Sequence, residues 1–323
     1  MAADRLKSTL AAPSHSRLDK FHACRRAYYY RYVRRLRARG DATRPLAGKC
    51  LHAALDVLYR RGYDAISEAR DVISAVYNGH LAEGKLAFLT PKHLCGILDN
   101  YVRQWPEQDD DFQPVRLHRS QIEANPAILL YAGSYDADGY TVLAEAPMVV
   151  RLAPGVTATV IMDLPVRRAN GEVWVVDHKA TCGWLSNLID THTITQQMPT
   201  YVLAMRAVLG ECSGAIINGI YMGEYACNPK STAQKFARWS DEHFGYTEGQ
   251  LSETLTWLQH STALAAVEEA TCGADEYLWL QHPSKQCGQC DYKPMCEVSP
   301  AMRQGRMQWY DVDDHEAEEA DNA

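Results

Sequence analysis

The stretch VIMDLPVRRANGEVWVVDHKAT, residues 160–181, predicts two neighbouring strands and decides the fold. Its first apolar run ends at Asp163, and its second run leads into Asp177 and Lys179. Side chains alternate along a strand, so residues two positions apart project from the same face. Asp177 and Lys179 therefore share a face. A carboxylate and an ammonium placed directly after a buried strand are costly in a core, which indicates a functional site.

The turn between the two strands determines whether the two aspartates meet. A two-residue Asn170-Gly171 turn would place Asp163 and Asp177 on opposite faces of the sheet. A three-residue loop with Gly171 in the left-handed conformation would instead pair the two aspartates on one face. Both turns suit the local sequence. We predict the three-residue loop, because only that register builds a site.

Two adjacent carboxylates repel each other and require a cation, and Mg²⁺ or Mn²⁺ suits a site of oxygen ligands. Lys179 beside them could orient or help to deprotonate a metal-bound water, or stabilise the charge of a phosphate. Taken alone, two acids and a lysine are better explained as a salt bridge at the end of a surface strand.

The surrounding pattern predicts an α/β (α+β) fold, with a central mixed sheet flanked by helices. Ser16 is the expected cap of the first helix and Gly40 its end. The predicted helices cover residues 16–40, 48–62, 65–106, 193–210 and 247–270, and the predicted strands cover residues 140–152, 156–166, 172–181 and 214–223.

One domain is expected over residues 1–300, followed by an acidic, disordered tail at 301–323 that contains DVDDHEAEEADNA. The domain is expected to begin with a helical N-terminal region, followed by a helical insert at residues 62–138 and a catalytic core at 140–225. The C-terminal cysteine cluster is expected to combine residue 24 with residues 287–296.

Composition and charge narrow the class of protein. Hydrophobic residues make up 46% of the chain, but no apolar run has membrane-spanning length and the N-terminus lacks the apolar core of a signal peptide. We therefore expect a cytoplasmic protein without a membrane partner. Residues 1–61 hold 15 lysines and arginines against four acids, although the whole chain has a net charge of -7. Such a local positive field can hold phosphates.

Ten cysteines in a chain without an export signal favour reduced thiols and metal ligands over disulfides. Cys287, Cys290 and Cys296 form C-x2-C-x5-C, but a tetrahedral zinc site or an iron–sulfur cubane needs a fourth ligand. From the residues alone, zinc and an iron–sulfur cluster are equally plausible. The other cysteines have no such spacing and are expected to be free thiols or small core residues: Cys50, Cys95, Cys182, Cys212, Cys227 and Cys272.

In their order along the chain, these motifs resemble the RecB-like branch of the PD-(D/E)XK nucleases. This family often has a glycine before its first aspartate, where this chain has Met162, and residues 62–138 match no family motif. The matching stretches are RLDKFHACRRAYYYRYV at 17–33, GKCLHAALDVLY at 48–59, VIMDLPV at 160–166, VVDHKAT at 175–181, QMPTY at 197–201 and CGQCDYKPMC at 287–296.

The resemblance implies a set of metal ligands. His52, Asp163 and Asp177 would ligate the catalytic Mg²⁺ or Mn²⁺, and the carbonyl of His178 would be a further ligand. Glu145 on an earlier strand is a weaker candidate, because a glutamate at a strand edge is usually solvated.

The resemblance also implies a catalytic group and a function. Lys179 would act on the attacking water, while Gln197 and Tyr201, one helical turn apart, would hold the lysine or the DNA backbone. The expected function is a metal-dependent deoxyribonuclease, an exonuclease on DNA ends or single strands. The alternatives are a non-catalytic nucleic-acid-binding module of the same fold and a zinc-stabilised structural protein.

An iron–sulfur subgroup of the family includes the AddB nuclease domain and exonucleases of CRISPR adaptation and of phages. It holds a [4Fe–4S] cluster with one N-terminal and three C-terminal cysteines. The resemblance therefore implies that Cys24 joins Cys287, Cys290 and Cys296. We expect a structural role, since the ligand bonds would fix the first helix against the end of the chain.

The stretch HACRRAYYYRYVRR, residues 22–35, is both aromatic and basic. Helical spacing predicts that Tyr28, Tyr29 and Tyr32 pack against the core, and that Tyr30 lies off that face. The arginines of this stretch are the predicted contacts to a nucleic-acid backbone.

Overall fold

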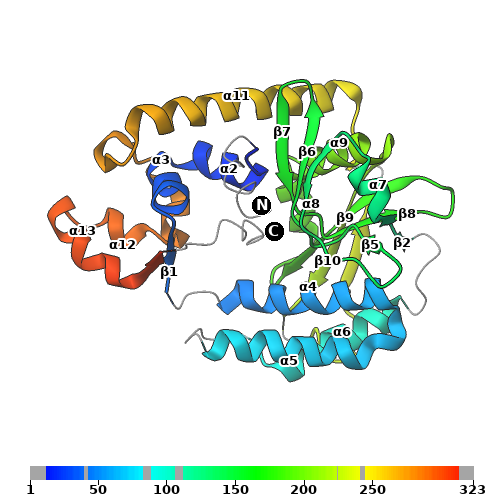
Figure 1. Ribbon diagram of the computed structural model, residues 1–323. Helices are drawn as coiled ribbons and strands as arrows, with labels where there is room; N and C mark the ends of the chain where they lie inside the picture. Colours follow the sequence, from blue (N-terminus) through cyan, green and yellow to red (C-terminus); the bar gives the residue numbers. More distant parts are fainter. Residues whose placement is uncertain are drawn as a thin grey trace.

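A computed structural model describes residues 12–39, 43–82, 89–105, 112–223, 225–240 and 244–312. Its central element is a mixed five-stranded sheet flanked by helices, which confirms the predicted fold class (Figure 1). Two neighbouring strands of this sheet, β9 and β10, are parallel, and the other pairs are antiparallel. In spatial order the strands are β11 (Phe236–Trp239), β10 (Gly214–Tyr221), β9 (Val173–Thr181), β8 (Leu164–Arg167) and β2 (Gln113–Pro114).

Helices cover both faces of the sheet because its central strands are apolar on both sides. On one face the helices are α4 (Thr43–Arg61), α5 (Ile66–Ala82) and α6 (Pro91–Gln104). On the other face α9 (Gln197–Leu209) packs on the sheet, and α11 (Glu248–Cys272) packs on α9.

The alternation of β9 determines where its charged residues point. Val175 belongs to the core under α9, and Val176 belongs to the core under α4. Continuing this alternation places Asp177 and Lys179 on the α9 face and His178 on the α4 face. The predicted shared face of the aspartate and the lysine is therefore confirmed.

The β8–β9 hairpin has the register of the three-residue loop. Gly171 has a φ of +90°, in the region that favours glycine. Leu164 pairs with Val176. One position further along, the same register sets Asp163 opposite Asp177, as predicted.

The predicted strand at 156–166 is in fact two strands in two sheets. β7 (Val156–Val160) belongs to a three-stranded antiparallel sheet with β6 (Met148–Ala153) and β4 (Ile128–Tyr131). The chain then crosses into β8 of the central sheet. Asp163 lies in this corner and is 5% exposed. The apolar residues on both sides of Asp163 fit one continuous strand as well as two short ones, so the sequence pattern missed the change of sheet.

The insert expected to be helical is helical only in its first part, which holds α5 and α6. Its second part contains β2, β4, β3 (Arg116–His118) and the short helix α7 (Arg119–Glu123), and β3 pairs with β5 (Tyr140–Val142). These strands are too short for their alternation to be distinguished from a loop.

The first predicted helix is broken at Cys24. The helix α2 (His15–Ala23) is capped by the Ser14 hydroxyl, not by Ser16, and Cys24 is extended with φ -162° and ψ 114°. The short helix α3 (Arg25–Tyr28) follows, and its Arg26 N–H donates to the Leu280 carbonyl at 3.0 Å. A distant segment thus takes the hydrogen bond that would have continued the first helix. The expected end at Gly40 lies outside the described residues.

A π-helix, η2 (Tyr29–Val33), follows α3, and the Arg34 N–H donates to the Tyr29 carbonyl at 2.8 Å. The wider turn rotates the following side chains away from ordinary helical positions. As a result Tyr30 is buried with Tyr28 and Tyr29, and the prediction that it lies off the core face is wrong.

The start of the predicted disordered tail is folded. After α12 (Lys293–Cys296), which lies within the predicted domain, residues Pro300–Arg306 form α13, and β12 (Tyr310–Val312) pairs antiparallel with β1 (Leu36–Ala38). Tyr310 is 5% exposed, so burial of its ring helps to hold this end. The remaining residues, 313–323, lie outside the described part.

The N-terminal and C-terminal segments form a lobe beside the sheet. Figure 1 shows α11 running along one side of the molecule and α4 along the other, with the lobe of α2, α3, α12, α13 and β1 between them. A cavity of about 2060 Å³ lies between this lobe and the sheet. Within the described residues, every helix is too short or too polar to span a membrane.

Candidate functional site

Two predicted metal ligands, His52 and Asp163, and the weaker candidate Glu145 lie together at one wall of the cavity. His52 from α4, Glu145 from the β5–β6 connection and Asp163 from the corner each offer a ligand atom, and these atoms all lie within 4.8 Å of one another. The Nδ1 atom of His52 is 3.3 Å from Glu145 Oε1 and 3.5 Å from Asp163 Oδ2. One imidazole and two carboxylates form a donor set that fits Mg²⁺ or Mn²⁺.

Glu145 takes part in this group, although its position at a strand edge suggested a solvated side chain. Its φ is +49°, one of two positive values at non-glycine residues in the described chain. Its N–H donates to the Met162 carbonyl at 2.8 Å, so the strained residue is held against the corner that carries Asp163. The strain is visible only in the folded chain, and no local sequence signal reveals it.

Opposite charges meet in this group of one histidine and two acids. Burial is the largest influence on both His52 and Asp163, and it raises the pKa of Asp163. Burial alone would lower the pKa of His52, but the Asp163 and Glu145 carboxylates outweigh it and raise that pKa to about 9. At neutral pH the imidazolium therefore supplies a positive charge between two acids, in the place where a divalent cation fits.

The second pair of predicted residues lies beside this group. Lys179 Nζ is 3.0 Å from Asp177 Oδ2, and both side chains are buried. Burial raises the pKa of Asp177 to about 6. The Gln197 amide donates to Asp177 Oδ1 and to the Tyr201 hydroxyl, each at 3.2 Å. Gln197 thus binds the aspartate that pairs with Lys179, whereas the family resemblance implies a contact to the lysine itself or to the DNA backbone.

His178 links the two acidic strands and then points away from the cavity. Its backbone N–H donates to Asp163 Oδ2 at 2.6 Å. Its ring stacks on Tyr59 and its Nδ1 lies 2.7 Å from the Asn218 amide, on the α4 face. The Asn218 amide also donates to the Tyr101 hydroxyl. This polar network supports the strand behind the site.

Two histidines that the sequence did not single out flank Lys179. His15 packs edge-on against Tyr201, with ring centroids 5.6 Å apart, and His192 is the last residue of α8 (Ser186–His192). Burial, followed by the charge of Lys179, lowers the pKa of His15 to about 3 and that of His192 to about 4. Both rings are therefore neutral at pH 7. Neither lies in a motif whose spacing could have indicated this.

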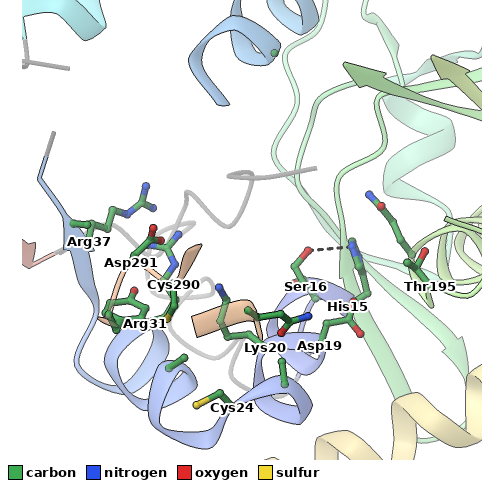
Figure 2. A pocket seen from close by; sticks show the side chains of 18 of the residues that line it. His15, Ser16, Asp19, Lys20, Cys24, Arg31, Arg37, Thr195, Cys290 and Asp291 are labelled. Carbon is green, nitrogen blue, oxygen red and sulfur yellow. Dashed lines mark hydrogen bonds between the residues drawn. The ribbon is translucent and has the colours of Figure 1, made fainter. Parts of the chain in front are cut away.

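The four cysteines proposed as cluster ligands line the opposite wall of the same cavity. Figure 2 shows Cys24 and Cys290 across the pocket from His15 and Thr195. Burial, followed by the neighbouring Cys24 and Cys290 thiols, raises the pKa of the Cys296 thiol. Folding therefore brings the N-terminal cysteine to the C-terminal loop. Of the other six cysteines, Cys50 and Cys212 are buried in the core.

Two arginines of the stretch 22–35, Arg25 and Arg26, are bound within the protein, which corrects their assignment to a nucleic-acid backbone, and Arg17 before this stretch is bound in the same way. Arg17, Arg25 and Arg26 form ion pairs with Glu269, Glu268 and Glu276, at 2.8, 2.9 and 3.3 Å. The carboxylates of α11 and of the following loop thus neutralise these three guanidinium groups. Arg31 and Lys20 line the cavity instead (Figure 2).

Comparisons with known proteins identify the family. No curated protein matches the chain. The crystal structure of SSO0001 aligns with 79% of this chain and 84% of that chain at 11% identity, with a TM-score of 0.29, and carries no weight here. The sequence model of the PD-(D/E)XK nuclease superfamily matches residues 12–297, nearly the whole described chain. The chain therefore belongs to the PD-(D/E)XK nuclease superfamily, a group of metal-dependent nucleases.

Proposed function

We propose that this protein is a Mg²⁺- or Mn²⁺-dependent deoxyribonuclease. The observation that carries the proposal is the acidic group of His52, Glu145 and Asp163 at one cavity wall, with Lys179 on the same wall and its fully buried partner Asp177 at 3.0 Å from the ammonium. His52, Glu145, Asp163 and Asp177 would hold the cation, and the His178 carbonyl would be a further ligand. A bound cation supplies positive charge to the phosphate and lowers the pKa of the attacking water.

The side chains around the cation have separate tasks. Lys179 orients the attacking water and stabilises negative charge on the phosphate, while Gln197 and Tyr201 keep Asp177 in place. The water oxygen forms a bond to phosphorus as the bond to the leaving oxygen breaks, and that oxygen takes up a proton. The products are a phosphate monoester and a hydroxyl end.

The shape of the molecule supports action on DNA ends or single strands. The cavity lies between the sheet and the terminal lobe, and α11 and α4 run along opposite sides of the molecule (Figure 1). A strand enters such a space most readily by its free end. Linear and circular single-stranded DNA of equal length test this: an exonuclease degrades only the linear form, and equal degradation of both would refute it.

Two variants that each remove a charge test the chemistry. Asp177→Asn and Lys179→Gln should each lower cleavage of labelled DNA by about 100-fold or more with Mn²⁺, because charge at the reacting phosphate is lost. Lys230→Gln, which changes an exposed lysine, is the matched control and should cleave normally. Full activity of both site variants would indicate a non-catalytic nucleic-acid-binding module instead.

We further propose that Cys24, Cys287, Cys290 and Cys296 bind a structural [4Fe–4S] cluster. Four thiols at one wall fit such a group, which would join α2 to the C-terminal lobe. Protein purified without oxygen should contain iron and sulfide and be brown, and Cys24→Ser should lose both. Cys272→Ser, at a half-exposed cysteine away from the cavity, should retain them. One zinc in a colourless protein would establish the zinc alternative.

A further inference from the structure

Two apolar side chains on either side of α8 are unusually exposed. Trp184 is 77% exposed and Ile194 is 82% exposed, the highest values among the large hydrophobic residues of the described chain. An indole left in water forgoes the stabilisation that burial would give it. An exposed indole beside a cavity is available to a ligand that could cover its face.

Their place in the fold is close to the catalytic strand. Trp184 follows Lys179 by five residues, and its neighbour Gly183 lines the cavity. Ile194 precedes Thr195, which also lines the cavity and lies in Figure 2 across from Cys24. Trp184 and Ile194 do not line the cavity themselves, but each adjoins in the chain a residue that does, which places both residues beside its rim.

The segment between them is anchored, so the exposure does not come from a loose loop. Leu185 is 7% exposed, and Leu188 packs close to the backbone of β10 at Gly219. A held segment keeps the indole ready to bind, which lowers the entropic cost of ordering it on a ligand.

The terminal lobe and the segment around α8 offer different contacts to a nucleic acid. Lys20 and Arg31, on the terminal lobe, line the cavity and offer positive charge for phosphates. Trp184 and Ile194 carry no charge and offer an aromatic face and an apolar contact. Nucleobases stack on such faces, with little dependence on sequence, because every base has a π-face.

We propose that Trp184, supported by Ile194, is a base-stacking subsite for the strand whose phosphodiester lies at the acidic group. This inference rests on the proposed nuclease function and names how the same site holds its substrate. The group that contacts Trp184 and Ile194 is a nucleobase of single-stranded DNA near the scissile bond.

The test compares a strand with bases and a strand without them. All proteins carry Asp177→Asn so that binding is measured without cleavage. Fluorescence polarisation gives the Kd for a labelled oligothymidylate and for an abasic strand of equal length. Trp184→Ala should weaken binding of oligothymidylate about tenfold and leave binding of the abasic strand unchanged. Trp184→Phe keeps an aromatic face and should restore most of the affinity.

Trp309→Ala is the matched control, because Trp309 is 41% exposed but lies on the terminal lobe, just before β12, and not beside the catalytic strand β9. It should bind both strands normally. The inference is overturned if Trp184→Ala weakens both strands equally or neither. It is also overturned if Trp184→Ala abolishes a concentration-dependent dimer in sedimentation, because the occupant is then a second copy of the chain.

A base-free ester separates this inference from the function on which it rests. Bis(p-nitrophenyl) phosphate reports on the catalytic centre of the unmodified protein with Mn²⁺. Hydrolysis of the ester, combined with unchanged strand binding by Trp184→Ala, would refute the stacking subsite alone. A protein that neither hydrolyses the ester nor binds DNA would refute the nuclease proposal as well.

Discussion

His15 makes the packing of the N-terminal helix α2 on α9, the helix that carries Gln197 and Tyr201, sensitive to acid. This first residue of α2 is 7% exposed, its Nε2 lies 3.0 Å from the Ser16 hydroxyl, and its ring contacts Tyr201 of α9. Burial, followed by the charge of Lys179, lowers the pKa of His15 from 6.5 to about 3. We predict that His15→Gln makes the protein less sensitive to acid, because glutamine keeps a polar contact but does not titrate.

The direction and the size of the change in the free energy of unfolding with pH follow from proton linkage. Above pH 6.5 His15 is neutral in both the folded and the unfolded chain and has no effect on the pH dependence. Between pH 6.5 and 3 the His15 ring is protonated in the unfolded chain but not in the folded chain. The free energy of unfolding therefore decreases as the pH is lowered through this range. Each pH unit in this window costs about 1.4 kcal/mol. At pH 5 the loss from His15 is therefore about 2 kcal/mol, a large part of a typical stability of about 5–15 kcal/mol.

Urea unfolding of the metal-free protein at pH 7.5 and at pH 5 measures the effect. On going to pH 5, His15→Gln should lose about 2 kcal/mol less free energy of unfolding than the parent. His260→Gln, which changes an exposed histidine on α11, should behave like the parent. NMR of ring-labelled histidine gives an independent readout. The reasoning fails if the His15 ring titrates near 6.5, or if the parent and His15→Gln lose equal stability.

Three further changes test separate features. Glu145→Gln removes one acid from the metal group and should weaken Mn²⁺ binding about tenfold by calorimetry, and unchanged affinity would exclude Glu145 as a ligand. Gly171→Ala, at φ +90°, should lower the free energy of unfolding by about 1 kcal/mol, and an unchanged denaturation midpoint would contradict the left-handed turn. Gly219→Ala would place a methyl group 2.7 Å from the Trp239 ring and should cost about 1–3 kcal/mol, measured in the same way. Full stability would show that the ring moves aside freely.

Local pattern was sufficient for the catalytic strand and its partner. The period of two in β9 predicted that Asp177 and Lys179 share a face, and the choice of turn predicted the register that sets Asp163 opposite Asp177. These features depend on residues close together in the chain, where strand alternation and the conformation of one glycine decide the geometry. The order of the motifs likewise predicted the family that the comparison shows.

Other parts of the site depend on contacts between residues distant in the sequence. The sequence by itself determined the alternation, the glycine turn and the order of motifs. Only the tertiary structure placed His15 against Tyr201 and Glu145 beside His52, and only it showed that a break in the first helix accompanies the position of Cys24 at the wall of the C-terminal cysteines, which the family resemblance had implied. The physical reason is that strand faces and tight turns are set by neighbouring residues, whereas the break at Cys24 and the strain at Glu145 are stabilised by hydrogen bonds from distant segments. No short window of sequence contains both partners of such a bond.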